Sequence, residues 1–199
     1  MKAHTIRTAT IVITGLACTA LVAGPTASAQ TSNQGCNMRL NMSDTSEVSQ
    51  WQTVLDGVMG GRSTGAHFAE TGHMTFKGRI NTNGGGFSSL RRAVPSGAMT
   101  GAKSVQLRIR QDTRTYKMTF RTNERIWGRP VSYQLNIPKT EAGVWTDVTL
   151  PLAGFRTSIF GREVQAAKFD PAQVREIVII IADGIDGPFQ IDVAAIACS

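Results

Sequence analysis

A chain of 199 residues, 41% of them hydrophobic, is long enough for one domain with a buried core. After the N-terminal apolar run no second hydrophobic span occurs, so we expect no transmembrane segment in the mature chain. The formal net charge of +7 favours acidic partners, such as an acidic protein surface, anionic lipid heads or acidic glycans.

The N-terminus has the pattern of a secretory signal peptide. Lys2 and Arg7 precede an apolar run at 11–22, and the small triplet Ala27-Ser28-Ala29 follows. The alternative, an uncleaved anchor, would need about 20 apolar residues, more than this run provides. We therefore expect a periplasmic or secreted protein, cleaved after Ala29, with no nucleic-acid partner. The predicted organisation is a signal peptide at 1–29, an N-terminal lead-in at 30–48 and a β-domain at 49–199.

Strands dominate the rest of the chain. Apolar and polar residues alternate in 105–110, 116–121, 131–137 and 189–193, which is typical of half-buried strands. The continuous β-branched run at 177–181 predicts a strand buried on both faces. Glycine-rich turns separate these segments, so the pattern indicates a β-sandwich or barrel. The only helical turn predicted is at Pro171, with Asp170 as its N-cap.

Positive charge concentrates in the middle of the chain. Eight cations fall between Lys103 and Arg129, opposed only by Asp112 and Glu124. Arg108, Arg110, Lys117 and Arg121 lie at polar positions of two successive predicted strands. If those strands pair, the four cations share one sheet face, which is either a binding face or pairs with carboxylates from elsewhere. A solvated basic surface without a specific role is the alternative.

Two cysteines remain after removal of the signal peptide. Cys36 and Cys198 stand at opposite ends of the domain, and export would place them in an oxidising compartment. We expect a disulfide between them.

Catalytic and metal-binding patterns are weak. Gly61 to Gly65 matches the G-x-S-x-G nucleophile pattern, but more strand, not a helix, is predicted to follow, which argues against a hydrolase. The acidic turn from Asp183 to Gly187 could help to hold calcium through oxygen ligands, but a plain hairpin turn explains it better. We predict no enzyme, no catalytic residue and no metal-binding residue, with calcium as an alternative.

Tryptophans differ in their predicted places. Trp51 and Trp145 lie at strand starts and are expected in the core. Trp127 lies in a loop between Arg125 and Arg129, the composition of an interface hot spot or a sugar-stacking platform. The alternative is a ring folded back over the edge of the core.

Six segments, taken in order, resemble the complex I intermediate-associated protein 30 family. They span about residues 49–196 and are Trp51 to Gly65, Asn83 to Arg91, Arg108 to Tyr116, Gly143 to Leu152, Phe160 to Arg162 and Asp186 to Phe189. The resemblance implies an all-β, galactose-binding-like jelly-roll sandwich. It also implies a chaperone-like role in assembling NADH:ubiquinone oxidoreductase.

The sequence and the resemblance together predict a non-catalytic exported binding module. Its partner would be a protein, including respiratory complex subunits or another acidic surface, and a carbohydrate is the alternative. The residues expected to contact the partner are Arg91, Arg110, Arg121 and Trp127. The residues expected to set backbone geometry are Asp56, Gly57, Met59, Gly60, Gly61, Gly86, Phe87, Gly187, Pro188 and Phe189.

Overall fold

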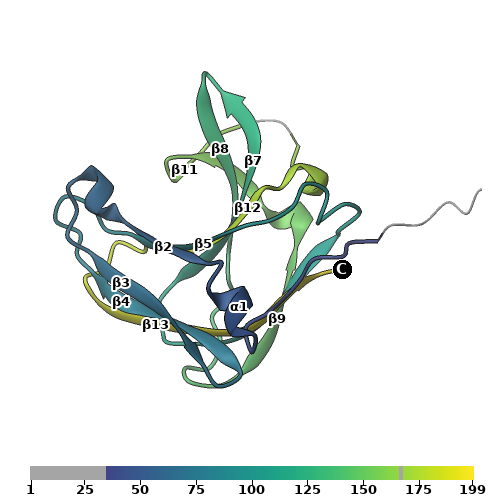
Figure 1. Ribbon diagram of the computed structural model, residues 1–199. Coiled ribbons are helices and arrows are strands. Elements are labelled where there is room, and N and C mark those ends of the chain that lie inside the picture. The colour runs from purple at the N-terminus through teal and green to yellow at the C-terminus, as the bar shows by residue number, and fades with distance from the viewer. Residues whose placement is uncertain (1–34, 166–167) are drawn as a thin grey trace, which may run out of the picture. The chain divides into compact units, whose positions relative to one another are not determined.

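The computed structural model describes residues 35–165 and 168–199. The predicted signal peptide, its cleavage site after Ala29 and the first residues of the lead-in lie outside this part. The described chain forms two antiparallel β-sheets, which confirms the all-β prediction (Figure 1).

The first sheet has six strands. These are β1 (Arg39–Asn41), β3 (Thr64–Glu70), β4 (His73–Ile80), β6 (Ser104–Gln111), β9 (Thr146–Pro151) and β13 (Gly187–Cys198). Their order is β3-β4-β13-β6-β9, and β1 also pairs with β13. The last strand of the chain therefore lies at the centre of this sheet.

The second sheet has seven strands. These are β2 (Gln52–Leu55), β5 (Ser88–Ala93), β7 (Tyr116–Ile126), β8 (Arg129–Asn136), β10 (Arg156–Ile159), β11 (Arg162–Glu163) and β12 (Glu176–Ile181). Their order is β11-β10-β8-β7-β12-β5-β2. Figure 1 shows the far ends of β7 and β8 projecting away from the six-stranded sheet.

Short helical turns connect the strands. They are α1 (Thr45–Val48) and the 3-10 turns η1 (Asp56–Met59), η2 (Leu152–Gly154) and η3 (Pro171–Gln173). The turn predicted at Pro171 is confirmed, because the Asp170 side chain caps it by accepting a hydrogen bond from Ala172 N at 2.9 Å. The lead-in predicted for 30–48 contains β1 and α1, so ordered structure begins inside it.

The core lies between the sheets and contains the apolar residues of the alternating strands. Among its fully buried side chains are Phe76, Leu107, Ile109, Tyr116, Met118, Phe120 and Tyr133. Burial of each side chain of this size contributes about 1.5–3 kcal/mol. Trp51 belongs to this core, as predicted. The same prediction for Trp145 is wrong, because its ring is half-buried on the face of the six-stranded sheet that points away from the core.

The two strands that carry the basic cluster do not pair. β6 lies between β13 and β9 in one sheet, whereas β7 lies between β8 and β12 in the other. The chain crosses from sheet to sheet through residues 112–115. The single basic face that pairing would have produced is therefore absent, and its cations are divided between two outer surfaces.

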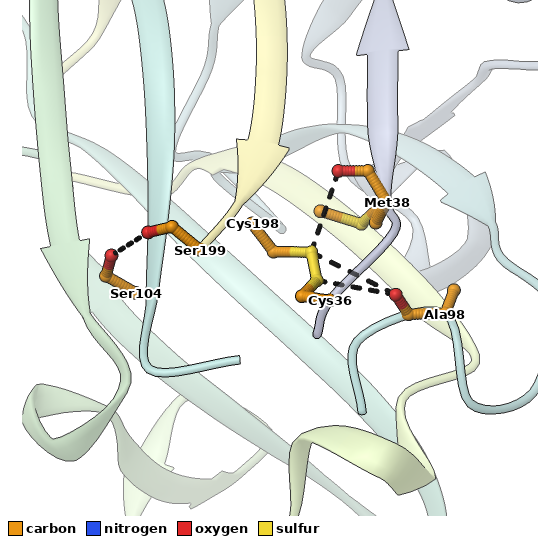
Figure 2. Close-up of a disulfide and its surroundings, with 6 residues drawn as sticks. All are labelled: Cys36, Met38, Ala98, Ser104, Cys198 and Ser199. Atoms are coloured by element: carbon orange, nitrogen blue, oxygen red, sulfur yellow. Dashed lines mark hydrogen bonds between the residues drawn. A yellow bond between two sulfur atoms is a disulfide. The ribbon is translucent and has the colours of Figure 1, made fainter. Parts of the chain in front are cut away.

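A disulfide joins Cys36, just before β1, to Cys198 at the end of β13, as predicted (Figure 2). The two Cα atoms are 5.9 Å apart, a normal separation for this bond. Next to it, the hydroxyls of Ser104 and Ser199 lie 2.7 Å apart, and the amides of Lys103 and Ser104 donate to the Ser199 carbonyl. Both ends of the described domain are thus held against the six-stranded sheet.

Candidate functional site

The face of the seven-stranded sheet that points away from the six-stranded sheet, called the outer face below, gathers two of the four residues predicted to contact a partner. Glu176 of β12 is opposite Arg121 of β7. The next outward position of β12, Val178, is opposite Arg91 of β5. Arg91 and Arg121 therefore lie on either side of β12, and along the strand direction they are offset by one outward-facing position.

Burial along β12 shows which side chains belong to this face. Ile177, Ile179 and Ile181 are part of the core between the sheets, whereas Val178 is 1% exposed and lies outside that core. Val178 is therefore buried on the outer face, as the prediction of a strand buried on both faces required. The side chains around it form a packed polar layer and not a loosely solvated surface.

Two hydroxyls in this layer lack partners. Thr119 of β7, next to Val178, is 2% exposed, and Ser158 of β10 is 5% exposed. Within residues 35–165 and 168–199, neither Oγ1 of Thr119 nor Oγ of Ser158 makes a hydrogen bond. A buried polar group without a partner costs about 1–3 kcal/mol.

The charges on the outer face are unbalanced. Nη1 of Arg121 lies 3.0 Å from Oε2 of Glu176, and Nε of Arg91 donates to Oγ of Ser89 at 3.2 Å. In the part of the chain that the structure describes, the two terminal nitrogens of Arg91 donate no hydrogen bond. Burial, and then the nearby charge of Arg121, lower the pKa of Arg91, although Glu176 opposes this. Arg91 stays charged at any physiological pH, so the pair favours an anionic group.

Asp56 is a buried carboxylate at the start of η1, and it organises the loops at one end of the same sheet. Its Oδ1 accepts from Ser63 N at 3.0 Å. Its Oδ2 accepts from the Ser63 hydroxyl at 2.5 Å, from Gly86 N at 2.6 Å and from Phe87 N at 3.3 Å. Burial works to raise the pKa of Asp56, but these four donors outweigh it and the pKa is lowered.

Glycines let the two loops approach Asp56. A Cβ at Gly61 would lie 2.2 Å from the Asp56 carboxyl carbon, and a Cβ at Gly85 would lie 2.4 Å from its Oδ2. Gly86 has a φ of +120°, a conformation that side chains avoid. The turn leaves Met59 65% exposed at its tip.

The remaining motif residues belong to the η1 turn, to the start of β13 or to the core. Gly57 is the second residue of η1, and Gly60 ends η1 with a φ of +88°. Gly187 has a φ of +126° at the start of β13, and the carbonyl of Pro188 accepts from Arg114. Phe189 packs edge-on against Phe76 in the core, with ring centroids 5.0 Å apart.

Arg110 lies in a different place, on the outer surface of the six-stranded sheet. Its Nε lies 2.7 Å from Oδ2 of Asp192, a carboxylate that is 2% exposed. The Thr75 hydroxyl donates to the other oxygen of Asp192, and the guanidinium of Arg110 lies 5.0 Å from the ring centroid of Trp145. The structure thus does not bring Arg110 together with Arg91 and Arg121.

Trp127 is at the tip of the β7–β8 hairpin and is 83% exposed. The ring does not fold back over the core, which was the alternative considered for it. Phe160, at the tip of the β10–β11 hairpin, is 76% exposed and lines the same hollow as Trp127.

Sequence reasoning missed the partners that complete these sites. Thr119, Ser158 and Glu176 come from three strands, and only the sheet register shows that they share a face with Arg91. Phe160 could have been noticed, because the residues around it repeat those around Trp127. Four of the eight cations in the basic cluster pair with carboxylates that are distant in sequence: Arg108 with Asp147, Arg110 with Asp192, Arg114 with Asp183 and Arg121 with Glu176.

The acidic turn weighed as a calcium site is engaged by protein groups. Both oxygens of Asp183 accept from Arg114, at 2.7 and 2.8 Å, and Asp186 accepts from Thr82 N. Over the described ranges, no three His, Cys, Asp or Glu side chains gather in a way that could hold a metal ion. No helix found there is long and apolar enough to cross a membrane.

Two packed antiparallel sheets define a β-sandwich, and one of its outer faces carries a packed polar layer. Residues 40–193 match the family described as complex I intermediate-associated protein 30. The chain belongs to this family, which confirms the resemblance found in the sequence.

Solved structures similar to the chain include carbohydrate-binding modules. One is the family 11 carbohydrate-binding module of the cellulosomal cellulase Lic26A-Cel5E of Clostridium thermocellum (15% identity, TM-score 0.56, covering 75% of this chain and 88% of that one). Another is the family 11 module from Clostridium thermocellum in complex with a β-1,3-1,4-mixed-linked tetrasaccharide (15% identity, TM-score 0.56, covering 80% of this chain and 95% of that one). The likeness confirms the galactose-binding-like jelly-roll fold. No protein of curated function matches the sequence significantly.

Proposed function

We propose that this protein is a non-catalytic, exported binding module that holds a client protein during assembly of a larger complex. The family description names an intermediate of complex I, NADH:ubiquinone oxidoreductase, and supports an assembly role. The disulfide between Cys36 and Cys198 supports export, because such bonds persist in oxidising compartments.

The observation that carries the proposal is the pair of arginines on the outer face. Arg91 and Arg121 lie beside one another in a half-buried layer, and a single carboxylate, Glu176, opposes them. Arginine binds carboxylates through two parallel hydrogen bonds, and the free terminal nitrogens of Arg91 suit this geometry. An acidic segment of a client protein therefore fits this face.

The test is recovery of the client with a tagged protein after mild crosslinking in its native cell. Replacement of Arg91 and Arg121 by Gln should lower client recovery about tenfold or more, the usual effect of removing interface hot spots. Arg108→Gln is the matched control, since Arg108 is an exposed arginine paired with Asp147 on the other sheet. Unchanged recovery with the double variant would contradict the proposal.

A second candidate function is carbohydrate binding. The row of uncharged polar side chains Ser132, Gln134 and Asn136 on the outer face of β8 favours it, because such groups can hydrogen-bond sugar hydroxyls. However, the outward strand positions of this sheet that the structure describes carry no aromatic side chain, and ligand pockets are mostly lined by apolar and aromatic groups. A glycan array separates the two functions: binding that is lost with Gln134→Ala but kept with Arg91→Gln would favour the sugar.

A further inference from the structure

Two hairpin tips of the seven-stranded sheet share one sequence and one backbone shape. The β7–β8 turn reads Ile126-Trp127-Gly128-Arg129, and the β10–β11 turn reads Ile159-Phe160-Gly161-Arg162. In each hairpin the Ile and Arg pair, so the aromatic residue and the glycine form a two-residue loop. The φ angles are +51° and +73° in the first loop and +49° and +77° in the second.

These values are unfavourable for an aromatic residue. Tight turns with two positive φ angles usually begin with Asn, Asp or Gly, and bulky side chains at such angles are rare. The chain nevertheless has a large ring at the first loop position of both tips. Strain of this kind persists mainly where it serves a function.

The rings are exposed and lie near arginines. Trp127 is 83% exposed and Phe160 is 76% exposed, and both line one hollow. The guanidinium carbon of Arg129 lies 5.4 Å from the centroid of the Phe160 ring. Arg125 and Arg162 are exposed beside the two turns. We call Arg125, Trp127, Arg129, Phe160 and Arg162 the tip cluster.

We propose that the tip cluster is a docking surface for an anionic membrane. Tryptophan prefers the interface between lipid and water, and arginines near such a surface are attracted to anionic head groups. The cluster has three arginines, and its acidic neighbours in the described hairpins are Glu124, which accepts from the Tyr133 hydroxyl, and Glu163. Its charge therefore complements an anionic bilayer.

The position of the rings favours a membrane over a protein partner. Protein hot spots normally lie near the centre of a well-packed patch and insert into a matching pocket. Here the rings stand at the tips of hairpins, and the β7–β8 hairpin projects away from the six-stranded sheet (Figure 1). Projecting tips can enter the head-group layer of a bilayer, where no matching pocket is needed.

The test is flotation of the disulfide-bonded protein, from residue 30 to 199, with vesicles. We expect it to float with vesicles of equal parts phosphatidylglycerol and phosphatidylcholine, and less with added salt or with phosphatidylcholine alone. The variant with both Trp127→Asn and Phe160→Asn should bind the vesicles at least about tenfold more weakly, because the apolar area that the rings bury in the bilayer is lost. Asparagine suits the first position of these turns, so the midpoint temperature of thermal unfolding of this variant should be unchanged or higher.

Phe68→Asn is the matched control, because Phe68 is 44% exposed on the six-stranded sheet, away from the tips, and vesicle binding should be retained. The proposal is overturned if the unaltered protein fails to float with anionic vesicles at low salt. It is also overturned if the double tip variant floats equally well. Crosslinking of the tips to a protein, without any vesicle binding, would assign them to a protein partner instead.

Discussion

Replacement of Asp56 by Asn should destabilise the domain strongly without unfolding it. One carboxylate oxygen receives a single donor and the other receives three, from Ser63, Gly86 and Phe87. In the best orientation, Asn keeps an acceptor for the three donors but turns an amide toward Ser63 N. One buried donor then loses its partner, which costs about 1–3 kcal/mol, and three charge-assisted bonds become neutral. We expect a loss of about 3 kcal/mol, within the 5–15 kcal/mol typical of a domain.

Urea unfolding at neutral pH measures this loss, and Asp147→Asn on the exposed surface is the control. Asp147 forms a solvent-exposed pair with Arg108, so its replacement should change stability by less than about 1 kcal/mol. Because folding lowers the pKa of Asp56, its contribution is present above the unfolded-state pKa and is lost as pH falls through the folded-state pKa. The difference between the protein and Asp56→Asn should therefore shrink in acid. A loss no larger than that of the control, or one that grows in acid, would refute the reasoning.

Two further predictions concern stability. Replacement of both Cys36 and Cys198 by Ser should lower the free energy of unfolding by up to about 5 kcal/mol, because the bridge closes a loop over 162 positions; urea midpoints that do not differ with and without reductant would argue against this. Arg110→Gln should cost about 2 kcal/mol, since it leaves the buried carboxylate of Asp192 without its cation. A change below about 0.5 kcal/mol in urea unfolding would mean that Thr75 and Gln190 alone satisfy that carboxylate.

Local patterns predicted the strands well, because the period-two alternation depends only on neighbouring residues. They could not predict that β6 and β7 belong to different sheets. Residues 112–115 are as short as a hairpin loop, and the crossing depends on core packing far along the chain. Trp145 was misplaced for a similar reason: its ring meets His73 across β6 and β13, near the irregularity between Val193 and Ala195.

The candidate site was predictable in part. Arg91 and Arg121 were named from the sequence, and the structure places them one outward position apart across β12. Their partners Glu176 and Thr119 were not named, because antiparallel register alone brings these strands side by side. Asp56 was expected to shape a turn, but its donors lie up to 31 positions away, in a second loop that no local pattern connects to it.

The most direct test of the central claim is site-specific photocrosslinking from the two outer surfaces in the native cell. A benzoylphenylalanine replaces Lys117 on the outer face, or Gln106 on the outer surface of the six-stranded sheet in a parallel sample. We predict that the probe at position 117 captures the same client that the tagged protein recovers, and that Arg91→Gln abolishes this capture. The probe at position 106 should capture no client. Equal capture from both positions, or capture from Gln106 alone, would contradict the assignment of the binding face.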